Sequence, residues 1–263
     1  MATFRIGALG CGLALLASAA AAQDDRLQQV LDRGELRVCA VNYTPWNIFD
    51  PIEDAWTGIN TDIVDEIAAA MEVRVGWVSS AWSTVIQDVI TDKCDLAASA
   101  LWTSPARAAN VSFTRSIGGD GSTLFVPLEA AVATYDDIDQ SGKVIAVMSG
   151  SADERVAKDM FTNAEVRSLV TDQLGAHVLE VASGRADAAF GGFAGNAQFV
   201  ASNPNIRVKA LEELLVNYVP FAYAVRAREY FFRDYINIVL SNLEASGRLE
   251  AIMASWTDTG STD

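Results

Sequence analysis

The chain is poor in the residues that most often bind metals or act as nucleophile partners. Of its 263 residues, one is histidine and three are cysteine. His177 has no cysteine or carboxylate cluster around it at metal-ligand spacing, and the chain offers no recognisable Ser-His-Asp set. The sequence therefore predicts no metal site, no cofactor and no catalytic triad.

Basic residues are also scarce. The chain has 19 Lys and Arg against 34 Asp and Glu, a net charge of −15. Such a surface repels phosphate backbones, so we expect no nucleic-acid partner. The acidic excess is typical of a solvated surface and does not indicate the charge of a ligand.

No apolar run in the sequence is long enough to cross a bilayer. A shorter apolar run lies near the start of the sequence. Arg5, the apolar stretch 6–17 and the small residues Ala20-Ala21-Ala22 are typical of a secretory signal over residues 1–22. Cys11 lies inside that stretch rather than after it, which argues against a lipid anchor. Removal of the signal leaves 18 basic and 34 acidic residues, a net charge of −16.

Two cysteines remain beyond the signal. In an oxidising compartment such a pair suggests a disulfide. However, Cys39 lies within one expected strand and Cys94 just before another. If those strands are parallel neighbours, the two residues are several positions out of register, beyond the Cα separation that a disulfide allows. The register disfavours a disulfide, and the sequence leaves both alternatives open.

Strand and helix patterns alternate twice along the chain, without a repeated sequence. The order β-α-β-α-β in each half predicts mainly parallel sheets flanked by helices. Extended segments at 122–127 and 218–225 connect the halves near Gly121 and Pro220, which indicates two lobes, a hinge and a cleft. The expected strands are 35–41, 73–78, 96–100, 144–147, 166–170 and 186–190; the expected helices are 26–32, 62–71, one from Ser83, 153–160, 174–183 and 228–256 with a break at Gly247.

Residues 95–114 carry the first candidate site residue. The apolar run 96–101 is typical of a buried strand, and Thr103-Ser104-Pro105 ends it and permits a helix to start. This places Arg107 at the C-terminal edge of a sheet, where open α/β folds bind small molecules. A guanidinium offers a planar set of donors that suits a carboxylate. The alternative is a surface arginine without a ligand.

Five segments in this order resemble the periplasmic solute-binding proteins of ABC importers, family 3, the class typified by binders of polar amino acids. They are RLQQVLDRGELRV at 26–38, TGINTDIVDEIAAAM at 57–71, ITDKCDLAASALWTSPARAANVSFT at 90–114, VASGRADAAF at 181–190 and NLEASGRLEAIMASW at 242–256. Together they span nearly the whole chain after the signal.

The resemblance implies the type II periplasmic-binding-protein fold, with two α/β lobes and two hinge strands. Lobe 1 would comprise residues 23–120 and 221–263, and lobe 2 residues 121–220. It further implies a periplasmic monomer that closes over a small solute and delivers it to a membrane ABC permease.

The resemblance also implies the site. Arg107 would hold the ligand carboxylate, and the turn before a lobe 2 helix would add backbone N–H groups. Trp102 stands where a small hydroxyl residue is common, and Gly192 where relatives present an acid to the ligand ammonium. The candidate ligand-binding residues are Arg107, Trp102, Ser99, Tyr43, Trp46, Trp82, Ser151, Ala152 and Gly192.

The glycine at 192 alters the ligand we expect. Asp153 or Glu154 could replace the missing acid, but nothing in the sequence places either of them in the cleft. We therefore expect a carboxylate with an apolar, aromatic or quaternary-ammonium body, held by tryptophans, rather than an ordinary α-amino acid. The pair Gly191-Gly192 is either a tight turn or an opening for a bulkier ligand.

Two other functions share the fold. Cyclohexadienyl dehydratases, which are similar to these binding proteins, process a carboxylated ring in the cleft and need an acid to protonate the leaving hydroxyl. Gly191-Gly192 stands where we would look for that acid, so we do not expect an enzyme. The third class is a periplasmic interaction module that serves a sensor or a dehydrogenase.

Overall fold

A computed structural model describes residues 25–171 and 173–257 of the chain. The expected signal over residues 1–22, including Cys11, lies outside the described residues. The strands are β1 Glu35–Val41, β2 Ile48–Asp50, β3 Ala55–Thr57, β4 Arg74–Ser80, β5 Leu96–Trp102, β6 Val111–Pro127, β7 Val144–Met148, β8 Glu165–Leu169, β9 Ala188–Gly192, β10 Val208–Ala210 and β11 Val216–Arg226. The α-helices are α1 Arg26–Arg33, α2 Ile59–Met71, α3 Val85–Ile90, α4 Pro105–Ala108, α5 Ala152–Met160, α6 Ala176–Ala182, α7 Phe193–Ala201, α8 Tyr230–Ala245 and α9 Arg248–Thr257.

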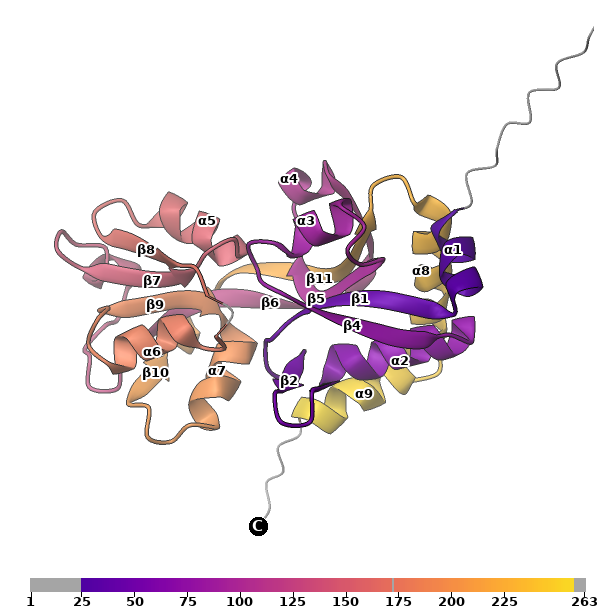
Figure 1. Cartoon of the computed structure of the whole chain (residues 1–263). Coiled ribbons are helices and arrows are strands. Elements are labelled where there is room, and N and C mark those ends of the chain that lie inside the picture. The colour runs from indigo at the N-terminus through magenta and orange to yellow at the C-terminus, as the bar shows by residue number, and fades with distance from the viewer. Residues whose placement is uncertain (1–24, 172, 258–263) are drawn as a thin grey trace, which may run out of the picture.

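One nine-stranded sheet links the described elements, in the order β4-β1-β5-β11-β6-β9-β7-β8 with β10 paired to β6. Its two ends are parallel: β1 pairs with β4 and β5, and β7 pairs with β8 and β9. The long strands β6 and β11 pair antiparallel at its centre. Figure 1 shows two bodies joined by these two strands. The expected α/β fold with mainly parallel sheets is confirmed.

The hydrophobic core divides in the same way. Two clusters belong to β1, β5 and β11, one covered by α1, α2, α8 and α9 and the other by α3. Two more belong to β7 and β9, one covered by α5 and the other by α6 and α7. We call the part around β1 and β5 lobe 1, and the part around β7 and β9 lobe 2. Because β6 and β11 run unbroken through the junctions expected at 120 and 220, those boundaries stay a prediction.

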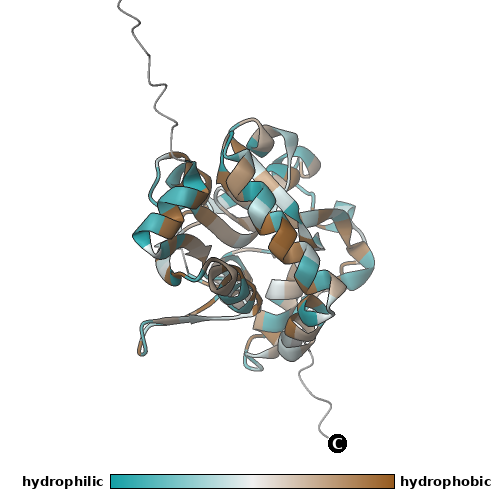
Figure 2. Cartoon of the chain, turned by 90° about the vertical axis from the view of Figure 1, so that its right-hand side faces the viewer, coloured by the Kyte–Doolittle hydropathy of each residue, from teal (hydrophilic) through white to brown (hydrophobic). Residues whose placement is uncertain are grey.

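The helices are amphipathic, as packing on one face of a sheet requires. In α2 the buried side chains include Ile59, Ile63, Ile67 and Met71, which recur every four residues. Figure 2, which views the molecule from the lobe 1 side, shows hydrophilic and hydrophobic residues alternating along the helices. No helix among the described residues is long and apolar enough to cross a membrane.

Most predicted elements are present within a few residues of their expected bounds. The predicted break at Gly247 separates α8 from α9, and this glycine adopts a left-handed φ of 74°. Four strands and α-helices were not predicted from the sequence: β2 and β3, which form a hairpin, the short strand β10, and the helix α7, which begins directly after Gly192.

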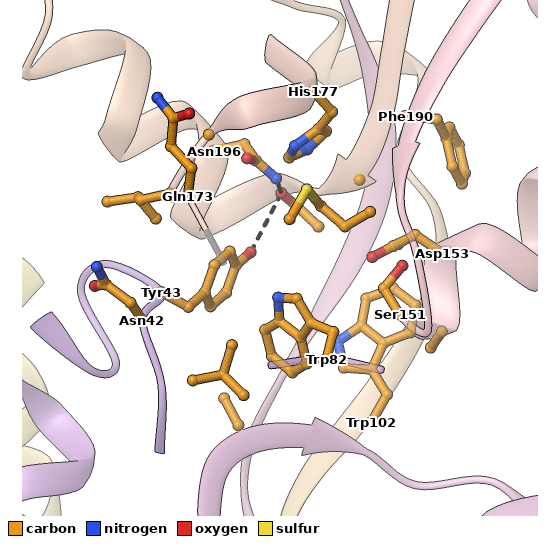
Figure 3. A pocket seen from close by; sticks show the side chains of 18 of the residues that line it. Asn42, Tyr43, Trp82, Trp102, Ser151, Asp153, Gln173, His177, Phe190 and Asn196 are labelled. Carbon is orange, nitrogen blue, oxygen red and sulfur yellow. Dashed lines mark hydrogen bonds between the residues drawn. The ribbon is translucent and has the colours of Figure 1, made fainter. Parts of the chain in front are cut away.

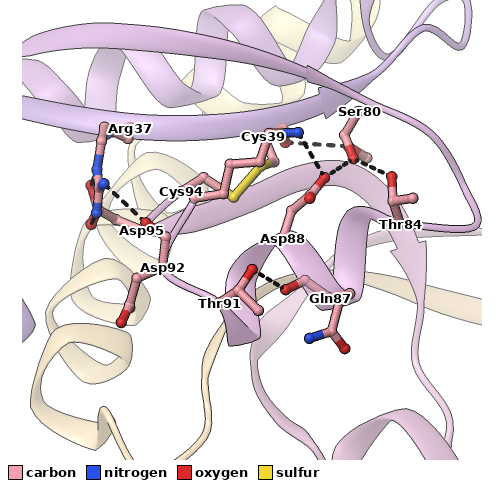
Figure 4. The surroundings of a disulfide bond; sticks show 12 residues. Arg37, Cys39, Ser80, Thr84, Gln87, Asp88, Thr91, Asp92, Cys94 and Asp95 are labelled. Atoms are coloured by element: carbon pink, nitrogen blue, oxygen red, sulfur yellow. Dashed lines mark hydrogen bonds and ion pairs between the residues drawn. A yellow bond between two sulfur atoms is a disulfide. The ribbon is translucent and has the colours of Figure 1, made fainter.

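The structure joins Cys39 and Cys94 by a disulfide, with their Cα atoms 5.7 Å apart, so the argument from strand register is wrong (Figure 4). Cys39 does lie opposite Ala97 in the parallel pair β1–β5. Cys94, however, belongs to a turn in which Asp92 has a φ of 60°. The turn brings Cys94 back to Cys39 in the core of lobe 1, beside α3. The register argument assumed an extended chain there.

Removal of the disulfide should destabilise lobe 1. The bond joins residues separated by 55 positions, and a cross-link of this span restricts the unfolded chain by an amount worth roughly 2–4 kcal/mol. We expect Cys39→Ala/Cys94→Ala to lower the free energy of unfolding by this amount in urea denaturation. As a control, a reducing agent should destabilise the wild type and leave the double variant unchanged. Equal stability of the oxidised wild type and the double variant would contradict the pairing.

Candidate functional site

A pocket opens where the two lobes meet, at the C-terminal ends of β1, β5, β7 and β9. Side chains from both lobes point into it (Figure 3). Seven of the nine predicted ligand-binding residues line this pocket: Tyr43, Trp82, Trp102, Arg107, Ser151, Ala152 and Gly192.

The other two predicted residues, Trp46 and Ser99, lie away from the pocket lining. Trp46 is 7% exposed and packs edge-on against Phe221 in the lobe 1 core, with ring centroids 4.9 Å apart. The hydroxyl of Ser99 is buried and accepts a hydrogen bond of 2.9 Å from the backbone N–H of Val41. Both side chains serve the packing of lobe 1.

Arg107 reaches the pocket because the chain turns into α4 directly after β5. Ser104 caps this short helix and accepts a hydrogen bond from the backbone N–H of Arg107. The guanidinium donates from Nη1 to the carbonyl of Trp102 at 3.0 Å and from Nη2 to the carbonyl of Gly150 at 3.2 Å. The second bond crosses from lobe 1 to lobe 2. Burial among protein atoms lowers the pKa of Arg107, because it removes water from around the guanidinium charge.

The turn from β7 into α5 forms the opposite wall. Ser151 caps α5 and accepts a hydrogen bond of 3.1 Å from the backbone N–H of Glu154. The Glu154 carboxylate in turn accepts one of 2.7 Å from the backbone N–H of Gly150. These reciprocal contacts fix the first turn of the helix. They leave Asp153, in that first turn, facing the pocket.

Asp153 supplies the acid that the sequence did not place in the cleft. Its Oδ1 accepts a hydrogen bond of 2.7 Å from the hydroxyl of Ser122 on β6. Burial among protein atoms raises the pKa of Asp153 to about 6. The hydrogen bond from Ser122 and the attraction of Arg107 act in the opposite direction and lower this pKa, but burial has the larger effect. The sequence left open whether another residue replaces the acid missing at Gly192, and the structure places Asp153 in the pocket lining.

A second carboxyl lies behind the first. Asp120 on β6 is 5% exposed and accepts hydrogen bonds from the backbone N–H groups of Gly121 and Ala194. Burial is the largest cause that raises its pKa to about 6, and the neighbouring Asp153 adds to the rise. The pocket lining thus has an acidic residue, Asp153, on lobe 2 and a basic residue, Arg107, on lobe 1, with Asp120 outside the lining.

The missing side chain at Gly192 does not leave an empty space that a larger ligand could fill. A Cβ at this position would lie 2.7 Å from the hydroxyl of Tyr43 and 3.1 Å from Oδ2 of Asp120. Tyr43 also donates a hydrogen bond of 3.4 Å to the carbonyl of Gly192. Lobe 1 and β6 therefore occupy the space where a side chain at 192 would extend.

Two further glycines let the lobes touch. Gly150 has a φ of 78°, and a Cβ there would lie 2.3 Å from Cα of Ser83 in lobe 1. A Cβ on Gly195 would lie 2.3 Å from the ring of Tyr43. Neither position accepts a side chain without movement of a neighbouring backbone or ring, so the lobe contact depends on both glycines.

Aromatic side chains from lobe 1 form one wall of the pocket. Tyr43 and Trp82 pack edge-to-face with ring centroids 5.7 Å apart, and Trp102 is 8% exposed beside them. The wall gives the pocket an apolar side next to its charged groups.

Several polar residues of the pocket were not predicted from the sequence. Asn42 comes from lobe 1, and Gln173, His177 and Asn196 come from lobe 2. The side chain of Asn196 donates a hydrogen bond of 2.8 Å to the carbonyl of Gly192. The only available signal was that His177 is the single histidine, and its helical context gave it no role. Within the described ranges, no cluster of three or more His, Cys, Asp or Glu residues could hold a metal ion.

Comparisons with known proteins agree with this architecture. The model of the bacterial extracellular solute-binding proteins, family 3, matches residues 36–259. A cyclohexadienyl dehydratase of Pseudomonas aeruginosa is 27% identical, over 96% of this chain and 94% of its own. An ABC transporter arginine-binding protein of Escherichia coli is 22% identical, over 76% and 81%.

Solved structures show the same fold. A putative binding component of an ABC transporter from Wolinella succinogenes, complexed with lysine, superposes with a TM-score of 0.78 at 28% identity, covering 86% of this chain and 97% of its own. An ancestral amino-acid-binding protein, described as a precursor of cyclohexadienyl dehydratase, superposes with a TM-score of 0.79 at 24% identity, covering 88% and 99%.

The raised pKa of Asp153 predicts a pH-dependent cost in stability. Its carboxyl binds a proton more tightly in the folded state, with a pKa of about 6 against 3.8, so stability falls as the pH rises from about 4 past 6. The full shift corresponds to about 3 kcal/mol, and partial access from the pocket reduces this to about 1–3 kcal/mol. We expect Asp153→Asn to raise the free energy of unfolding by this amount at pH 7.5 and not at pH 4.

Urea denaturation between pH 4 and 8 measures this effect. Asp159→Asn, which changes an exposed aspartate of the same helix, serves as the matched control and should follow the wild-type profile. If the difference between Asp153→Asn and wild type does not vary with pH, Asp153 does not occupy a poorly solvated site.

Proposed function

The chain belongs to the bacterial extracellular solute-binding proteins of family 3, and we propose that it captures a small amino-acid-like solute in the periplasm and delivers it to an ABC importer. The observation that carries this proposal is the pair of opposite charges in one pocket. Arg107 enters the pocket from lobe 1 and Asp153 from lobe 2. Among the described residues the two side chains form no ion pair with each other. Arg107 donates to two backbone carbonyls, and Asp153 accepts from the hydroxyl of Ser122.

A zwitterion would complement both charges at once. Arg107 uses two of its five N–H donors on carbonyls, so donors remain for a carboxylate. The solute carboxylate would also meet the N-terminal end of α5, where Ser151 and Ala152 would contribute backbone N–H groups. The ammonium would approach Asp153, with Asp120 behind it. This replaces the expectation of a solute without an α-ammonium, since that expectation depended on the absence of an acid.

Closure follows from contacts with both lobes. A solute that touches Arg107 and Asp153 binds the closed arrangement better than an open one, and it shifts the population toward closure by that difference in affinity. In this proposal β6 and β11 bend near residues 120 and 220. The close contacts at Gly150 and Gly195 define how far the lobes approach. The protein acts as a monomer and meets its membrane permease in the closed state.

Loss of the Arg107 charge should abolish solute capture. Ligand at one hundred times its dissociation constant stabilises the folded state by about 2.7 kcal/mol, which raises the melting temperature of a protein of this size by roughly 5–10 °C. We expect such a shift from one or more of the twenty standard L-amino acids with wild type, and a shift below about 1 °C with Arg107→Ala.

Differential scanning fluorimetry measures both shifts. Arg74→Ala removes an exposed arginine at the far end of lobe 1, where Arg74 pairs with Glu35, and should keep the wild-type response. An undiminished shift in Arg107→Ala would remove this residue from the site.

Dehydratase activity is the second candidate, and Asp153 is the observation that favours it. A carboxyl with a pKa of about 6 is partly protonated near neutral pH and can donate a proton to a leaving hydroxyl. The likeness to a cyclohexadienyl dehydratase over nearly the whole chain points the same way. We favour the binding protein because the same carboxyl, ionised, matches the ammonium of the solutes that the other relatives are named for.

A turnover assay separates the two functions. The protein is incubated with carboxylated cyclohexadienyl alcohols, and the aromatic product is followed by ultraviolet absorbance. We expect no product above the uncatalysed rate, from wild type or from Asp153→Asn. Product formation by wild type that is lost in Asp153→Asn would establish the enzyme and contradict the binding-protein proposal.

A further inference from the structure

His177 is a buried polar residue of the pocket whose side chain has no role in the binding proposed above. It lies in the first turn of α6, it is 4% exposed, and it lines the pocket. Figure 3 shows its imidazole directed toward the same space as the hydroxyl of Tyr43 and the carboxylate of Asp153. Neither Nδ1 nor Nε2 has a hydrogen-bond partner among the described residues.

A buried polar group of this kind is costly. The large majority of buried side-chain polar atoms in folded proteins have a hydrogen-bond partner, and leaving one without a partner costs roughly 1–3 kcal/mol of stability. Burial lowers the pKa of His177 to about 4, so the imidazole is neutral at neutral pH. It then offers one donor and one acceptor.

The absence of a side chain at Gly191 leaves room for the imidazole ring of His177 in this position. A Cβ on Gly191 would lie 2.8 Å from Nε2 of His177 and 3.0 Å from Nδ2 of Asn196. The imidazole therefore occupies the space that a side chain at 191 would take. The interpretation of Gly191 as an opening for a bulkier ligand is wrong, because His177 fills it.

We propose that His177 binds an uncharged hydrogen-bonding group of the solute, such as a hydroxyl or a carboxamide, beyond its carboxylate and ammonium. This rests on the proposed function, since it describes the remainder of the same solute. The two charged ends find opposite charges in Arg107 and Asp153. A third charge at His177 would be buried against a neutral ring without a counter-charge. An apolar group would leave the ring nitrogens unpartnered.

Calorimetric titration with pairs of amino acids of similar shape tests the proposal. The pairs are L-threonine with L-valine, L-asparagine with L-leucine, and L-tyrosine with L-phenylalanine. In wild type we expect the polar member of at least one pair to bind about tenfold or more tightly than the apolar member. In His177→Leu the preference should fall below about threefold, mainly through weaker binding of the polar member. His177→Gln, which keeps a donor and an acceptor, should retain part of the preference.

A second variant leaves the histidine in place. Gly191→Ala puts a methyl group 2.8 Å from Nε2, which is too close for an undisturbed ring, at a position without a left-handed φ. It should therefore displace the ring and reduce the preference as His177→Leu does. This variant decides the question if His177→Leu does not fold, as judged by its thermal transition.

The outcomes separate this proposal from the proposed function. If amino acids bind but no pair is discriminated, or if both His177→Leu and Gly191→Ala keep the wild-type preference, His177 does not contact the solute and the binding function stands. If no amino acid binds wild type, the proposed function fails and the role of His177 fails with it.

Discussion

The proposed binding function depends on two opposite charges that face one pocket from different lobes without pairing with each other. Arg107 is held at the end of β5 by its bonds to the carbonyls of Trp102 and Gly150, and Asp153 is held at the start of α5 by Ser122. Charges in poorly solvated places are costly unless they are compensated. In the proposed function, a solute with both a carboxylate and an ammonium would offer that compensation and so give its binding a driving force.

The contact between the lobes makes this arrangement possible. Gly150 and Gly195 bring the lobe 2 backbone against Ser83 and Tyr43 of lobe 1, at distances that exclude a Cβ. The continuous strands β6 and β11 join the lobes through one sheet, and β6 also carries Ser122 and Asp120. The contact between the lobes, the placement of the charges and the aromatic wall therefore involve the same few segments.

The fold and the position of Arg107 at a sheet edge were predictable from the sequence, because they depend on local patterns. Alternating strands and helices indicated two α/β lobes, and the strand-Pro-helix order placed Arg107 at a sheet edge. The rest depends on contacts between distant segments. Asp153 was named only as a possible replacement for the missing acid, because its direction depends on Ser122 of another strand. Trp46 turns into the core against Phe221, and a turn at Asp92 brings Cys94 to Cys39; residue type and register indicate neither.

The most direct test of the account is whether the solute needs both of its charged ends. Calorimetric titration with the standard L-amino acids identifies the tightest binder, and two analogues of it follow, one without the α-ammonium and one without the α-carboxylate. Loss of one partner of a desolvated charge pair costs about 3–5 kcal/mol. We expect each analogue to bind at least about one hundredfold more weakly than the amino acid itself. An analogue without the ammonium that binds as tightly as the amino acid would contradict this expectation.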